Sequence, residues 1–95
     1  MSDHRPIVDQ YLRAAFPEAS IADHDDPGHG RLWSIQRHRA VMVLRVSEQF
    51  LAAPSEEEAR TLLQRLDLAK ALRESAGRVV VLSRHGLRYV PAIPT

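Results

Sequence analysis

Cysteine is absent from this chain of 95 residues, and its absence excludes disulfide bonds, thiol nucleophiles and thiolate zinc sites together. Such a composition fits a reducing compartment, so we expect the protein to be cytoplasmic. Long apolar runs are also absent, because no stretch approaches the ~18 consecutive apolar residues of a membrane-spanning helix. Asp9, Gln10 and Arg13 interrupt the N-terminal segment too early for a signal peptide. We therefore expect neither membrane insertion nor export by a signal peptide.

Lysine is almost absent, since Lys70 is the only one and the other basic residues are all arginines. Arginine can bind a carboxylate or a phosphate through two parallel hydrogen bonds. The net charge is only +1, so no overall field attracts nucleic acid. The charges are nevertheless sorted along the chain: residues 1–30 carry six acidic residues and two arginines, whereas residues 77–95 carry three arginines and no acidic residue.

The rest of the composition is that of an ordinary globular domain. Hydrophobic residues make up 44% of the chain and charged residues 26%, close to the averages for soluble domains. A chain of this size buries roughly 60–70% of its unfolded surface, which is enough for one core. We therefore expect a single domain over residues 1–95, with residues 91–95 as a short extended tail.

Two segments have the pattern of amphipathic helices. Pro6 suits the first helical turn, and apolar residues at three-and-four spacing predict a helix over residues 6–16 that ends before Pro17. Ser55 with Glu58 forms a capping box, and an apolar stripe continues to residue 76, which predicts a helix over residues 55–76. The alternative is a break near Asp67, although no glycine or proline marks one there.

Alternating and β-branched residues predict the strands. Residues 20–24 suit an edge strand, residues 25–30 a loop, and residues 32–36 and 40–46 a strand pair that turns at residues 37–39, with one long bent strand as the competing interpretation. Residues 79–82 and 87–90 suit a second hairpin. The predicted fold is α+β, in the order α-β-β-β-α-β-β, with an antiparallel sheet of four to five strands and two helices packed on one face.

The strand at residues 40–46 is apolar on both faces, so it is either central or in contact with a partner. Phe50, between this strand and the next helix, either closes the end of the core or projects into a partner, and closing the core is the favoured interpretation because the chain has few aromatic residues. The candidate partner-binding set combines these apolar residues with nearby arginines: Arg31, Arg37, Arg39, Arg45, Val41, Val43 and Phe50.

A second set of residues suits the binding of nucleic acid. In this alternative, arginines follow a phosphate backbone, aromatic rings stack on bases, and the hairpin at residues 79–90 acts as a wing beside a helix that breaks near Asp67. The residues are Arg78, Arg84, Arg88, Trp33 and Tyr89. The three consecutive acidic residues at positions 56–58 would repel phosphate at the start of the long helix.

Metal-binding and catalytic patterns are weak. The loop around residues 23–29 offers His24, Asp26 and His29 as metal ligands, but turn chemistry already explains its residue types. His38 and His85 are each flanked by arginine, and no nucleophile or carboxylate is assigned beside either of them. We therefore expect no metal site, no cofactor and no catalytic residue.

From these patterns we expect a small noncatalytic interaction or regulatory module that binds an acidic protein surface. Its partner is another protein or a second copy in a homodimer. The alternative is a nucleic-acid-binding regulator that uses the arginine-rich strands and the winged hairpin. A metal-dependent enzyme is the third hypothesis, and it would require the histidines to converge in space.

Overall fold

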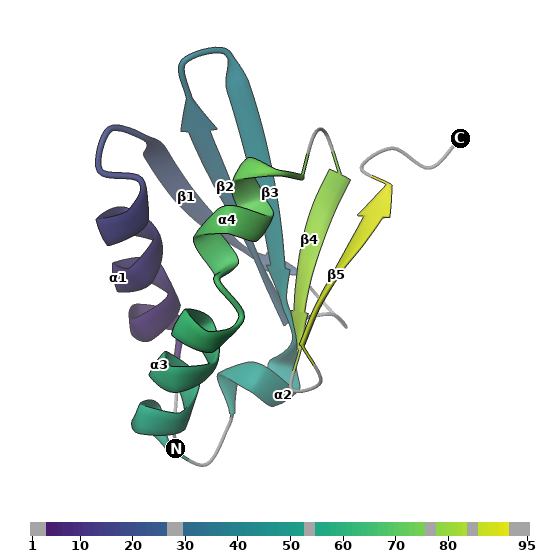
Figure 1. The fold of residues 1–95 in the computed structure, drawn as a ribbon. Coiled ribbons are helices and arrows are strands. Elements are labelled where there is room, and N and C mark those ends of the chain that lie inside the picture. The colour runs from purple at the N-terminus through teal and green to yellow at the C-terminus, as the bar shows by residue number, and fades with distance from the viewer. Residues whose placement is uncertain (1–3, 27–29, 53–54, 76–77, 84–85, 92–95) are drawn as a thin grey trace.

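The computed structural model describes residues 4–26, 30–52, 55–75, 78–83 and 86–91. One five-stranded sheet has helices α1, α3 and α4 on one side and the short α2 at its lower end (Figure 1). The elements, in chain order, are α1 (Arg5–Ala15), β1 (Ser20–Asp26), β2 (Gly30–Arg37), β3 (Ala40–Val46), α2 (Glu48–Leu51), α3 (Glu56–Arg65), α4 (Leu68–Arg73), β4 (Arg78–Ser83) and β5 (Gly86–Pro91). The predicted α+β class and the order of its elements are confirmed.

The sheet is mixed, so the prediction of a purely antiparallel sheet is wrong. Its strands lie in the order β1-β2-β3-β4-β5, and every neighbouring pair is antiparallel except β3 and β4, which are parallel. The reason is the connection: the chain leaves β3 at the lower end of the sheet and passes through three helices before β4 begins at the upper end (Figure 1). A crossover of this kind returns the chain to the same end of the sheet, which makes the two strands parallel.

A break at Asp67 divides the helix predicted over residues 55–76, so the continuous helix is wrong and its alternative is confirmed. The α3 helix begins as expected, because the Ser55 hydroxyl accepts a hydrogen bond from the Glu58 amide at 3.1 Å. Asp67 then adopts the left-handed conformation, with φ 52° and ψ 58°. Aspartate tolerates this conformation better than most residues. The Tyr11 hydroxyl accepts a hydrogen bond from the Ala69 amide at 3.1 Å, which holds the start of α4 against α1.

The described residues form four helices rather than the two expected. Besides the division of the long helix, a single turn of helix follows β3. Ser47 caps this turn by accepting a hydrogen bond from the Phe50 amide at 3.2 Å. The α1 helix agrees with its prediction: Pro6 lies in its first turn, and Ile7, Val8 and Leu12 are buried.

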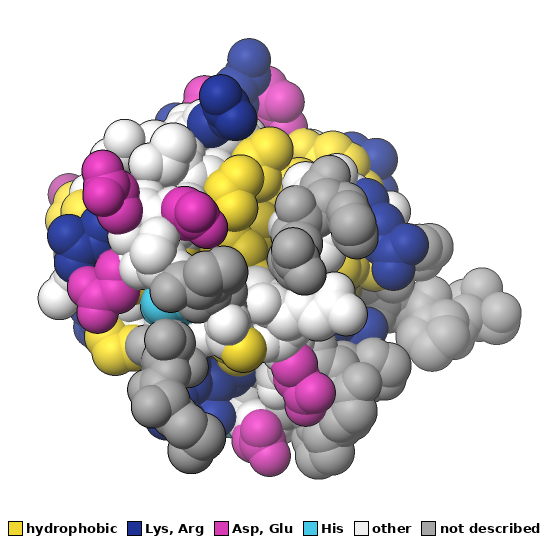
Figure 2. All heavy atoms as spheres, turned by 90° about the horizontal axis from the view of Figure 1, so that it is seen from below, with side chains coloured by type: hydrophobic (Ala, Val, Ile, Leu, Met, Phe, Trp, Pro, Cys, Tyr) yellow, Lys and Arg dark blue, Asp and Glu magenta, His cyan; other side chains and the backbone are white. Residues whose placement is uncertain are grey.

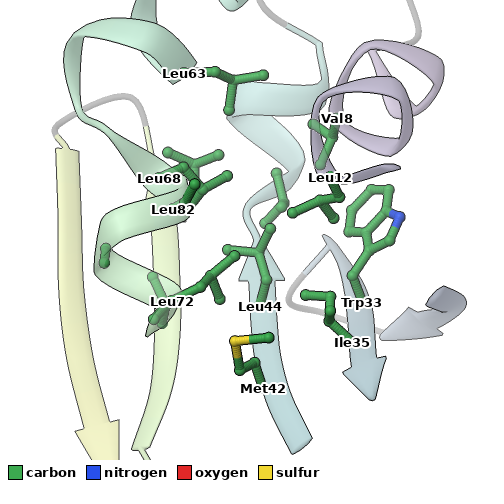
Figure 3. Close-up of a cluster of buried hydrophobic side chains, with 14 of the residues drawn as sticks. Val8, Leu12, Trp33, Ile35, Met42, Leu44, Leu63, Leu68, Leu72 and Leu82 are labelled. Atoms are coloured by element: carbon green, nitrogen blue, oxygen red, sulfur yellow. The ribbon is translucent and has the colours of Figure 1, made fainter. Parts of the chain in front are cut away.

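The core lies between the helices and one face of the sheet (Figure 3). Its sheet side is formed by alternate residues of the three central strands, and its helix side by the apolar faces of α1, α3 and α4. Residues that the close-up labels include Leu12, Trp33, Leu44, Leu63, Leu72 and Leu82, of which none is more than 1% exposed. This packed layer leaves the opposite face of the sheet without a helix among the described elements.

Two turns depend on unusual backbone conformations. The β2–β3 hairpin has a two-residue loop, because Arg37 pairs with Ala40, and His38 in this loop has a φ of 53°. The hairpin is therefore confirmed over the long bent strand. Gly30, at the start of β2, has a φ of +108°, and a Cβ atom there would overlap the carbonyl oxygen of Val46 and lie 2.8 Å from the Glu48 nitrogen. Only glycine fits this close approach between β2 and the junction of β3 with α2.

Candidate functional site

The candidate site lies on the face of the sheet that points away from the helices, called here the open face. Residues alternate between the two faces of a strand, and in β3 Met42, Leu44 and Val46 are buried on the helix side. Val41, Val43 and Arg45 therefore belong to the open face. Its apolar side chains, placed by this alternation and by strand register, are Leu32, Val41, Val43, Val79, Val81 and Val90. Val41 is 53% exposed, so the open face presents apolar surface to solvent.

Strand pairing arranges the open face in rows across β3, β4 and β5. One row is apolar, because Val43 pairs with Val79 and Val79 pairs with Val90. The next row, nearer the lower end, places Val81 between Arg45 of β3 and Arg88 of β5. Neighbouring strands are about 4.8 Å apart, so the two arginine Cα atoms are roughly 10 Å apart. Two cations thus lie on either side of one apolar residue.

A groove of about 790 Å³ crosses the lower end of this arginine row. Its walls come from the end of β3, the start of α2 and the strands β4 and β5. The lining residues are Arg45, Ser47, Glu48, Gln49, Val81, Ser83, Gly86, Leu87, Arg88 and Val90. The described lining therefore combines two arginines and one glutamate with apolar and small polar groups, and its formal charge is positive.

The predicted arginines are divided among three places. Arg31 lies on the helix side of β2, and its Nε donates a hydrogen bond to an Asp23 carboxylate oxygen at 2.6 Å. This hydrogen bond lowers the pKa of Asp23 below its ordinary value, and the positive charge of Arg31 adds to the effect. Arg37 and Arg39 are exposed at the upper β2–β3 turn, and only Arg45 lies in the groove. The structure therefore does not bring the predicted partner-binding arginines into one cluster.

Phe50 is fully buried in the core. It lies on α2, beneath the end of the sheet, and its amide is held by the cap at Ser47. The expectation that this residue closes the end of the core is therefore confirmed, and Phe50 is unavailable as a surface contact.

The two aromatic residues proposed to stack on bases are either buried or in contact with other residues of the chain. Trp33 has no exposed surface. The ring of Tyr89 lies 4.3 Å from the Arg78 guanidinium carbon, and its hydroxyl donates a hydrogen bond to the Ala71 carbonyl at 3.2 Å. Arg88 lies on the open face, and Arg84 falls outside the described residues. Trp33 is therefore unavailable for stacking, and Tyr89 lies on the opposite face of β5 from Arg88.

The helix that could enter a nucleic-acid groove, α4, packs against the core instead. In α4, Leu68, Ala69, Ala71 and Leu72 are buried, which leaves little of this six-residue helix to enter a nucleic-acid groove. The break near Asp67 is therefore present, but it turns α4 onto the sheet.

The candidate metal ligands do not gather within the described part of the chain. His24 and Asp26 both belong to β1, and the His24 side chain is exposed. His29 and His85 lie outside the described residues. No three His, Asp or Glu side chains among those that the structure describes are placed to hold a metal ion. His38 is exposed in its turn.

Sequence reasoning missed the β4 and β5 part of the open face. The run Val79-Val80-Val81 is apolar at adjacent positions, which is the signal of a strand that presents apolar side chains on both faces. That signal identifies the valines, but it does not place Val81 beside Arg45, since their proximity depends on the parallel pairing of β3 with β4.

Figure 2 shows the lower end of the molecule, where side chains of both charges surround a hydrophobic patch. An acidic side chain lies directly to the left of this patch and basic side chains lie to its right. None of the helices in the described ranges has the length and apolar character needed to cross a bilayer. The chain matches no family model, no curated protein and no solved structure.

Proposed function

We propose that this protein is a noncatalytic interaction module whose open face binds an acidic surface of another protein. The observation that carries the proposal is the apolar row Val43, Val79 and Val90 lying beside the arginines of the next row. Apolar area supplies binding free energy, and flanking cations select an acidic partner and speed its association. No described helix or strand covers these side chains.

A second copy of the chain is a less suitable partner. In a twofold symmetric dimer the same patch meets itself. A twofold axis through the arginine row would bring Arg45 and Arg88 of one copy near those of the other, and like charges in an interface cost free energy. An acidic patch on a different protein avoids this repulsion.

Nucleic acid has less support than a protein partner. The proposed stacking residue Trp33 is buried, and the ring of Tyr89 already carries Arg78. The net charge of +1 adds little attraction to phosphate. The arginines at the β2–β3 turn remain exposed, so the test includes nucleic acid as an outcome.

Site-specific photocrosslinking in the native cells tests the proposal. A photoreactive amino acid at Val41, on the open face, is compared with one at Thr61, which is exposed on α3. We expect a discrete protein adduct from position 41 and none from position 61. The adduct should disappear when Val43 is replaced by aspartate, while circular dichroism shows an intact fold.

Three results would contradict the proposal. Adducts of equal yield from both positions would indicate general proximity in the cell. An adduct that nuclease removes would favour the nucleic-acid alternative. The absence of any adduct from position 41 would leave the open face without a partner.

A further inference from the structure

We propose that the groove at the lower end of the open face binds an extended acidic segment of the partner, whose carboxylates pair with Arg45 and Arg88 on either side of Val81. This proposal rests on the proposed function, and it names the segment of the partner and the residues that bind it. The groove provides three features that together favour such a segment: paired cations, an apolar residue between them and an open shape.

The paired cations set the spacing of the acidic residues. Side chains two residues apart in an extended chain point the same way, and side chains four residues apart lie about 13 Å from each other. The Arg45 and Arg88 Cα atoms, two strand spacings apart, are separated by roughly 10 Å. Arginine side chains are long enough to spread outward, so two acidic residues separated by three others match the pair. The exposed Arg88 can bind its carboxylate through two hydrogen bonds, and the half-buried Arg45 adds a second positive charge at the other end of the pair.

The apolar residue between the arginines sets the middle of the segment. In an extended chain the residue midway between the two acids points to the same side as they do. This side chain would rest on Val81, with Val90 beside it in the lining. The favoured pattern is therefore acid, any residue, apolar residue, any residue, acid.

The remaining lining residues are compatible with this occupant. The Ser47 hydroxyl is already engaged in capping α2, and the Ser83 hydroxyl donates a long hydrogen bond to the Gly86 carbonyl at 3.5 Å. Glu48 is exposed at the rim and places one negative charge against the two arginines. It would disfavour additional acidic residues at its end of the groove, which limits binding to segments with the right spacing.

A peptide explains the groove better than a free anion does. Phosphate or a single carboxylate would satisfy one arginine and leave the apolar floor uncovered. The groove is also continuous with the apolar row through Val90, which belongs to both. A chain that leaves the groove along this row would extend its contact over the rest of the open face.

The first test is a titration of the isotope-labelled full chain with a synthetic peptide, Gly-Glu-Ser-Val-Ser-Glu-Gly with blocked ends, followed by amide chemical shifts. We expect saturable shifts grouped at Ser47, Val81 and Arg88. Replacing both glutamates of the peptide by glutamine should weaken binding by about tenfold or more, because it removes both ion pairs. Added salt should weaken the acidic peptide only.

Matched protein variants decide whether the groove arginines are responsible. Arg88→Glu and Arg39→Glu make the same change of charge at exposed positions in different places, the first in the groove and the second at the upper turn. We expect Arg88→Glu to weaken binding by about tenfold and Arg39→Glu by less than about twofold. Arg45→Glu together with Arg88→Glu should abolish binding, with Arg37→Glu together with Arg39→Glu as its control. If the half-buried Arg45 is needed for folding, the single Arg88 variant still decides the question.

Each contrary outcome overturns the proposal in a different way. Equal weakening by Arg88→Glu and Arg39→Glu would indicate a general effect of charge. Equal binding of the glutamine peptide would exclude ion pairing, and matching shifts with inorganic phosphate alone would make the groove a site for free anions. No shifts at the groove would exclude it as a peptide site. If the adduct from position 41 forms while the groove does not bind the peptide, the proposed function stands and this inference fails.

Discussion

The two faces of one sheet differ in what surrounds their side chains. On the helix side, Val80 is fully buried between the sheet and the helical layer. On the open face, its neighbour Val79 is only half-buried, although both are valines in the same strand. The difference teaches that apolar character alone does not identify the core in this protein, because the helical layer covers only one of two apolar faces.

The largest expected effect is at Gly30, which has no side chain. It tests whether side-chain burial alone determines how much each position of the sheet contributes to stability. Gly30→Ala places a Cβ atom against the Val46 carbonyl and the Glu48 nitrogen, in addition to the strain of a φ of +108°. We expect a loss of more than about 4 kcal/mol of unfolding free energy or a failure to fold. Chemical denaturation measures this loss.

Gly86→Ala is the matched control for the Gly30 variant. Gly86 also has a positive φ, +124°, but the nearest atom to an added Cβ is a methyl carbon of Leu66 at 3.9 Å. Only the conformational strain remains there, so we expect a loss of about 1–3 kcal/mol. Equal losses at both glycines would show that the backbone conformation, and not the close approach at Gly30, is responsible.

The next prediction compares the unfolding free energy contributed by a valine on each face of the sheet. Val80→Ala removes buried methyl groups and leaves a cavity, so we expect a loss of about 2–3 kcal/mol of unfolding free energy. Val79→Ala removes the same atoms from the half-buried open face, where we expect a loss of about 1 kcal/mol or less. Denaturant midpoints of the two variants provide the measurement. Similar losses would mean that the open face is covered in solution.

A smaller effect on stability is expected at Asp67, between α3 and α4, where the backbone conformation rather than side-chain packing is changed. Asp67 has a left-handed conformation and its side chain makes no capping hydrogen bond. Asp67→Gly should therefore raise the unfolding free energy by about 0.5 kcal/mol, since the relief of strain exceeds the added entropy of the unfolded chain. Asp67→Ala should lower it by about 1 kcal/mol. Thermal unfolding compares the two, and a stabilising alanine would contradict the assigned conformation.

The smallest effect lies at the edge strand β1, where the Asp23 side chain is exposed. Arg31 lowers the pKa of Asp23, so this carboxylate contributes stability above the pKa of the unfolded chain and loses that contribution as the pH falls through its lower folded value. For a partly exposed pair we expect Asp23→Asn to cost about 0.5 kcal/mol near neutral pH. The cost should shrink in acid and at high salt, and a cost that grows as the pH falls would reverse the assignment.

Local signals were sufficient to predict much of the fold. The proline in the first turn of α1, the alternation in β2 and β3, and the serine cap of α3 each act over a few residues. The break at Asp67 could not be predicted with the same certainty, because no glycine or proline marks it and its stabilising contact comes from Tyr11 in another helix. Tertiary packing therefore ends the helix at this position, although the apolar stripe in the sequence continues past it.

The candidate site was predictable only in part for a similar reason. Alternation in residues 40–46 placed Val41, Val43 and Arg45 on one surface, as the structure has them. Arg88 belongs to the other predicted set, because its place in the row of Arg45, across Val81, depends on the pairing of β3 with β4, which are distant in sequence. Register across the parallel pair is not encoded in any short segment.

The parallel pairing of β3 with β4 also bears on how the chain folds. The hairpins on either side of this seam, β2–β3 and β4–β5, join residues that are close in sequence. The seam itself pairs Val46 with Leu82 and closes a loop that contains three helices. Because the entropy of loop closure must be met before such distant contacts form, we expect the seam to set the rate of folding. The arginine row spans this seam, so the groove forms only when the slowest contacts of the sheet are in place.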